Sequence, residues 1–155
     1  AAAVSTPRAL KSDSDLEATH GPGTATLAGE PEIVWLTAES LGDADPALAA
    51  HPDLPVTFVF DAARLRRWRL SRKRLVFLAE TLAEIGARRD LRLWRGNPAD
   101  VLRGHHLAAT FTPVPGWRML REELSVVAVH PWPWLRWPHA GSLRSYSAWR
   151  KHLKA

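Results

Sequence analysis

Residues 55–94 read PVTFVFDAARLRRWRLSRKRLVFLAETLAEIGARRDLRLW, and this stretch decides the fold. Residues 56–60 are dense in β-branched and aromatic side chains, which is typical of a buried strand. Ser71 is a good N-cap, and after it apolar residues recur at spacings of three and four: Leu75, Leu78, Leu82 and Ile85. This spacing predicts a helix with one buried stripe. Residues 91–94 predict the next strand, so the stretch is a strand, helix, strand unit.

The same alternation continues on both sides of this unit. Further strands are predicted at 33–36, 107–111 and 125–129. Asp45-Pro46 and Asn97-Pro98 each combine an N-cap with proline at the first helical position, and so predict two short helices. Strands with two apolar faces, separated by helices, form parallel sheets that are covered on both sides. We therefore expect an α/β fold, a single Rossmann-like domain with a five-stranded parallel sheet flanked by helices.

The fold class predicts where a ligand binds. In open parallel sheets the binding crevice lies outside the carboxyl ends of the strands, where the strand order changes direction. The candidates for a cofactor-binding cleft are therefore residues that end the predicted strands or follow them: Leu36, Thr37, Glu39, Asp61, Phe111 and Thr112.

Length and composition set the domain organisation. The chain has 155 residues, 46% of them hydrophobic, which suits one domain with its own core. We expect an extended tail at 1–30, the α/β domain at 31–130, and a Trp/Pro-rich segment with a short terminal helix at 131–155. The chain has no cysteine, which excludes disulfides, thiolate metal sites and cysteine nucleophiles. It has no apolar run long enough for a transmembrane helix.

The N-terminal residues suggest a compartment. The chain begins with three alanines and no Met, and residues 1–12 contain Arg8 and Lys11 but no acid. This composition is typical of what remains near a cleaved organellar transit peptide. We expect a mitochondrial or plastid location in preference to the bacterial cytoplasm. The alternative is an ordinary bacterial N-terminus from which the Met has been removed.

Five stretches together resemble the N-terminal, antenna-chromophore domain of the DNA photolyase and cryptochrome family. The segments SRKRLVFLAETLAEI at 71–85 and LRLWRGNPADVL at 91–102 are similar to the family patterns SxxRxxFLxESLxxL and LxxxxGxPxxVL. The other three are IVWLTAESLGDADPALAA at 33–50, PVTFVFD at 55–61 and GSLRSYSAWRKHL at 141–153. The resemblance implies a Rossmann-like domain that holds an antenna chromophore beside a separate FAD-binding domain, and we expect no FAD-binding domain in this chain.

Two loops depart from the family pattern, and both border the expected cleft. The family's Arg-Arg-Asp-Leu-Arg run is replaced by Thr-Ala-Glu-Ser-Leu at 37–41, and its Asn/Asp-Tyr-Glu-Pro run by Thr-Pro-Val-Pro-Gly at 112–116. We therefore expect no bound cofactor and no FAD, with an antenna folate or flavin as the alternative. Because no catalytic set and no metal-binding spacing of histidines is found, we expect that the chain is not an enzyme.

A basic cluster at residues 64–74 marks one surface for partners. It places seven cations within eleven residues, and Trp68 lies among them. Cations near a helix N-terminus oppose the helix dipole, which favours an external counter-charge. We expect four of these arginines, Arg64, Arg66, Arg67 and Arg69, to contact an acidic protein surface or anionic lipid; nucleic acid that stacks on Trp68 is the alternative.

A second candidate surface is the segment HPWPWLRWPH at 130–139. Its prolines impose an extended backbone, and its tryptophans Trp132, Trp134 and Trp137 have little regular structure to bury them. The segment is interpreted either as a strap across the domain or as an interface, since tryptophan is enriched in binding hot spots.

Three functions compete on these observations. The first is a non-catalytic, photolyase-like accessory or scaffold subunit of a larger assembly, organellar in the favoured setting. The second is a stand-alone antenna-chromophore or nucleotide-binding module, and the third is a nucleic-acid-binding module that uses the basic cluster. The sequence favours the first, because its additions to the fold are typical of contact surfaces while its ligand loops have diverged.

Overall fold

The computed structural model describes residues 21–67, 70–133 and 146–151. Trp68, Arg69, Trp134 and Trp137 of the predicted partner surfaces lie outside these residues. The chain divides into two compact units, and the sheet belongs to the unit Gly21–Trp132. In the other unit, the described part of the chain includes one short helix, α7 (Tyr146–Lys151).

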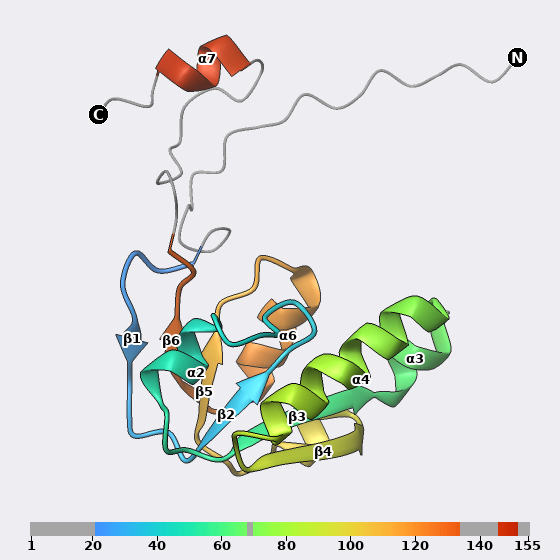
Figure 1. Ribbon diagram of the computed structural model, residues 1–155. Helices are drawn as coiled ribbons and strands as arrows, with labels where there is room; N and C mark the ends of the chain where they lie inside the picture. The colour runs from blue at the N-terminus through green and yellow to red at the C-terminus, as the bar shows by residue number, and fades with distance from the viewer. Residues whose placement is uncertain (1–20, 68–69, 134–145, 152–155) are drawn as a thin grey trace, which may run out of the picture. The chain divides into compact units, whose positions relative to one another are not determined.

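Six strands form a mixed sheet in the order β1-β6-β5-β2-β3-β4 (Figure 1). They are β1 (Thr26–Leu27), β2 (Ile33–Leu36), β3 (Val56–Asp61), β4 (Leu91–Gly96), β5 (Leu107–Thr110) and β6 (Val126–His130). All neighbours are parallel except β1 and β6, which are antiparallel. The predicted α/β class is confirmed, whereas the prediction of a five-stranded, wholly parallel sheet is wrong because of β1.

Tertiary pairing, and not local sequence, creates β1. The strand has two exposed residues and no alternation of apolar and polar side chains. Thr26 pairs with Val129 and Leu27 with Ala128, and the Ala28 amide donates to the Val127 carbonyl at 2.7 Å. This short strand therefore covers the outer edge of β6.

Three helices begin where the sequence predicts an N-cap. They are α2 (Pro46–Ala50), α4 (Arg72–Gly86) and α5 (Pro98–Val101). Asp45 Oδ1 accepts from the Leu48 amide at 2.9 Å, and the Ser71 hydroxyl accepts from the Arg74 amide at 3.3 Å. Two more helices were not predicted, α3 (Ala62–Arg67) and α6 (Pro115–Glu123). The first lies in the basic cluster, and the second begins in a Pro-Gly sequence, which is also typical of a loop.

The helices cover both faces of the sheet. Alternate residues of β2 belong to two separate core clusters. Val34 and Leu36 cluster with residues of α2 and α4. Ile33 and Trp35 cluster with residues of α5 and α6. Helices α2 and α4 therefore cover one face and α5 and α6 the other (Figure 1). This arrangement is doubly wound, and the direction of the strand order changes between β2 and β5.

Two predictions about the core are wrong. Leu75 belongs to the predicted buried stripe of α4 but is 40% exposed, while Leu78, Leu82 and Ile85 are buried. Trp94 belongs to the strand predicted at 91–94 in a sheet covered on both sides, but it is 51% exposed. Trp94 lies in β4, which is an edge strand of the sheet. In a central strand, the neighbouring strands and their helices would cover the ring.

Candidate functional site

A cavity of about 280 Å³ opens at the carboxyl ends of β2 and β3, beside the point where the strand order changes. It is bordered by the ends of these two strands, by α3, by the first turns of α4, and by α6. The lining is mainly apolar, and its residues are Trp35, Leu36, Thr37, Ala38, Glu39, Phe58, Val59, Phe60, Asp61, Arg64, Leu65, Leu70, Arg74, Leu78, Pro98, Val114, Trp117 and Leu120.

The structure brings together four of the six residues predicted for the cleft. Leu36, Thr37, Glu39 and Asp61 line the cavity, and Arg64 of the basic cluster lines it with them. The other two, Phe111 and Thr112, follow β5 and are buried without lining the cavity.

Phe111 has a packing role instead. Its ring stands edge-on to the ring of Trp117, with the ring centroids 5.1 Å apart. Gly21, which has a positive φ, lies on the same ring, and a Cβ there would come within 2.6 Å of it. Phe111 therefore joins the N-terminal end of the compact unit to α6.

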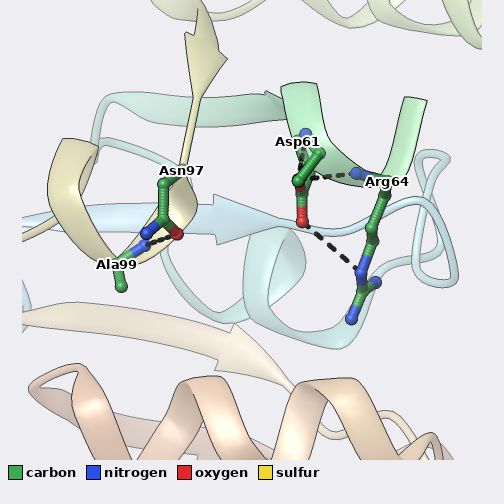
Figure 2. Close-up of polar contacts among 5 residues, drawn as sticks. Asp61, Arg64, Asn97 and Ala99 are labelled. Atoms are coloured by element: carbon green, nitrogen blue, oxygen red, sulfur yellow. Dashed lines mark hydrogen bonds and ion pairs between the residues drawn. The ribbon is translucent and has the colours of Figure 1, made fainter. Parts of the chain in front are cut away.

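Asp61 anchors the wall of the cavity. Its Oδ1 accepts from the amides of Ala63 and Arg64 at 2.9 and 3.0 Å, and its Oδ2 lies 3.4 Å from Nε of Arg64 (Figure 2). Asn97 caps α5 in the same view, where its Oδ1 accepts from the Ala99 amide at 3.1 Å. Both oxygens of Asp61 are thus engaged in holding the first turn of α3 and the Arg64 side chain.

Two arginines supply positive charge to the lining. Arg64 comes from α3 and reaches α6, where a Cβ on Gly116 would collide with its guanidinium. Glycine at this position leaves room for the Arg64 side chain in the conformation that it adopts here. Arg74 is exposed and comes from the first turn of α4. The lining also contains the carboxylates of Glu39 and Asp61, and Asp61 pairs with Arg64. Arg74 is therefore the cation of the lining that is suited to an anionic group on a ligand.

Trp117, which lines the cavity, has an unpaired hydrogen-bond donor. Its side chain is 3% exposed, and its Nε1 has no hydrogen-bond partner among the described residues. Leaving a buried donor unpaired costs about 1–3 kcal/mol, so such groups usually have a partner in the working state of a protein. Sequence reasoning missed this residue because α6 was not predicted.

A pair of histidines lies apart from the cavity. His51, at the end of α2, and His130, at the end of β6, have their Nε2 atoms 3.0 Å apart. Burial lowers the pKa of both imidazoles, and in His130 the charge of His51 lowers the pKa further. The two rings therefore favour their neutral forms, in which one donates a hydrogen bond to the other. Within the described ranges, no three His, Asp or Glu side chains gather to hold a metal ion.

The predicted partner residues are only partly described. Arg66 and Arg67 are exposed on α3, and Trp132 is half-buried after β6. None of the helices in the described part of the chain has the length and apolar character that crossing a bilayer requires.

Comparisons with models of known protein families, with curated proteins and with solved structures find no match to this chain.

Proposed function

We propose that this domain is a non-catalytic binding module that holds a planar, anionic organic molecule in the cavity at the carboxyl ends of β2 and β3. The observation that carries the proposal is the cavity itself, at the position where doubly wound sheets bind ligands. A chromophore- or nucleotide-binding module is therefore favoured over an accessory subunit that binds no small molecule.

The chemistry of the lining supports one ligand class. Aromatic and aliphatic side chains suit a flat ring system, and the volume lies just below the roughly 300–1,000 Å³ of sites for drug-sized ligands. The unpaired Nε1 of Trp117 suits an acceptor atom on that ring. Arg74, which is exposed on the first turn of α4, suits a phosphate or carboxylate. Nucleotides, flavins and folates share these three features.

The photolyase resemblance supports the same type of module, although the loops at 37–41 and 112–116 depart from the family pattern. Antenna domains of that family hold a folate or flavin-type chromophore in a Rossmann-like domain and leave the chemistry to another domain. A module of this kind acts as an accessory to a separate catalytic protein, and so the proposal includes a place in a larger assembly. Asp61 would remain a structural residue, because its two oxygens already hold α3 and Arg64.

The test is titration of the whole chain with FMN, with a folate and with AMP. Trp35 and Trp117 line the cavity, so bound ligand should quench tryptophan fluorescence. At a ligand concentration of about 100 times Kd, the folded state should gain about 2.7 kcal/mol, seen as a higher Tm. Failure of all three ligands to change either signal would overturn the proposal.

Variants locate the ligand. Trp117→Phe keeps an aromatic ring but removes the pyrrole ring with its N–H, and the loss of one hydrogen bond should weaken binding roughly five-fold. Arg74→Gln should weaken binding of the anionic ligand roughly ten-fold or more. Arg103→Gln is the matched control, since Arg103 pairs with Asp100 and does not line the cavity. An equal effect of Arg103→Gln would place the ligand elsewhere.

A second candidate function is an accessory subunit that binds no small molecule. It is favoured by the apolar side chains Leu93 and Trp94, which are 52% and 51% exposed on one strand. This function predicts no response to the three ligands, together with a partner that contacts β4.

A further inference from the structure

Strand β4 is an open edge of the sheet. Among the described residues it pairs with β3 alone, so its other side presents a row of free N–H and C=O groups. Leu93 pairs with Phe58 and Trp94 with Val59, and successive residues of a strand point to opposite faces. The strand therefore exposes one large apolar side chain on each face of the sheet. Long, uncovered edges with apolar residues are where sheets accept another strand.

Positive charge surrounds this edge. Arg92 and Arg95 flank the two apolar residues and are exposed. Helix α3 contacts β4 and contributes the exposed Arg66 and Arg67. Asp90 lies 3.2 Å from Arg92 in an exposed ion pair, and β4 itself has no acidic residue. Arginines on an edge disfavour pairing with a second copy of this chain, because they would face like charges.

We propose that β4 is the docking site for an extended, acidic strand of a protein partner, which adds to the sheet as a seventh strand. The geometry of β4 also sets the order of side chains in the partner strand. Directly opposed residues in neighbouring strands share a face, so the segment facing Arg92-Leu93-Trp94-Arg95 should read acidic, apolar, apolar, acidic. That order is the same in both directions, and so it fits a parallel or an antiparallel strand. The inference goes beyond the ligand in the cavity and gives a site to the accessory-subunit function.

A protein strand fits this surface better than nucleic acid does. A strand would use the free backbone groups of β4 and would cover Leu93 and Trp94 on both faces at once. A phosphate backbone would engage the arginines but would leave the row of N–H and C=O groups and one apolar face without partners.

The test uses a labelled eight-residue peptide with the core Glu-Val-Val-Glu, added to the whole chain. We expect saturable binding by fluorescence anisotropy and slower hydrogen exchange of the amides in residues 91–96. The permuted core Val-Glu-Glu-Val has the same charge and composition but places carboxylates opposite Leu93 and Trp94. It should bind at least ten-fold more weakly.

Charge reversal on the protein supplies the matched control. Arg95→Glu should weaken binding of the Glu-Val-Val-Glu peptide at least ten-fold, and Arg103→Glu, which changes net charge equally outside β4, should not. The double variant Arg92→Glu, Arg95→Glu should instead bind a Lys-Val-Val-Lys peptide. Trp117→Phe should leave peptide binding unchanged, which separates this site from the ligand cavity.

Three results would overturn the proposal. One is equal binding of the two peptide orders, which would show attraction by charge alone. Another is binding without slower exchange in residues 91–96. The third is tight binding of an oligo-dT strand that displaces the peptide, which would make the surface a nucleic-acid interface.

Discussion

Asp45 is a buried carboxyl that caps a helix, and burial of its charge destabilises the folded state. Its carboxyl caps α2 through the Leu48 amide at 2.9 Å and is almost completely buried. Burial raises the pKa of this carboxyl above its usual value of 3.8, against the opposing effect of its hydrogen bonds. As pH rises from 3.8 through the raised pKa, Asp45 loses its proton in the unfolded chain before it does so in the folded protein. The free energy of unfolding therefore falls over this pH range.

Substitution at Asp45 should separate the cap from the charge. Asp45→Asn keeps an oxygen for the Leu48 amide and removes the buried charge, so we expect equal or higher stability at pH 7 and a flatter dependence between pH 4 and 7. Asp45→Ala removes the cap and should cost about 0.5–2 kcal/mol. Urea unfolding at several pH values measures both. Greater loss with Asn than with Ala would contradict this account.

The pair of His51 and His130 predicts weakening in acid. The pKa of each imidazole is below its usual value of 6.5 in the folded state, so the unfolded chain takes up protons first as pH falls below 6.5. The pair's contribution to the free energy of unfolding should therefore be largest above about pH 7, and it should fall at lower pH by up to about 1.4 kcal/mol per pH unit for each proton. His51→Gln should flatten this dependence in a series of Tm measurements. His106→Gln, at an exposed position outside the pair, is the control.

At the scale of elements, α4 tests how far periodicity predicts burial. Leu82 packs under the helix and Leu75 does not, although both belong to the predicted stripe. We expect Leu82→Ala to cost about 2–5 kcal/mol and Leu75→Ala about 1 kcal/mol or less. Urea unfolding of the two variants measures the difference. Equal losses would mean that Leu75 is covered in solution.

Strand and helix signals predicted most elements because each signal is local. The Asp45-Pro46, Ser71 and Asn97-Pro98 caps mark three helix starts, and β-branched runs mark the parallel strands. Helix α3 was missed because its apolar content is low and no single face of it is buried. Helix α6 was missed because Pro115-Gly116 is also a common turn sequence, and only the packing of Trp117 on Phe111 decides between the two.

At the scale of the whole molecule, topology predicted the position of the cleft but not its chemistry. Leu36, Thr37, Glu39 and Asp61 line the cavity, and the sequence pointed to them because they end strands or follow them. The approach of Arg64 to Gly116 joins segments about fifty residues apart in the sequence, and no local pattern encodes it. The openness of β4 was likewise hidden, since an apolar run looks the same at the centre of a sheet and at its edge.

The N-terminal limit of the folded unit predicts a difference between two fragments. Residues 21–132 retain Gly21 on Phe111 and the pairing of β1 with β6, whereas residues 31–132, cut at the end of the tail expected from the sequence, lose both. The longer fragment should unfold cooperatively in urea, and the shorter should be less stable by roughly 1–3 kcal/mol, the worth of a few hydrogen bonds and one close packing contact.

Removal of β1 should also promote self-association, which urea unfolding does not measure. It leaves β6 as an exposed parallel edge with Val127 and Val129, and such an edge pairs with other chains. The shorter fragment should therefore form oligomers as its concentration rises, measured by light scattering, while the longer fragment does not. Equal stability and equal dispersity would show that residues 21–30 contribute nothing to the fold. If the longer fragment fails to fold where the whole chain does, residues outside 21–132 contribute to its core.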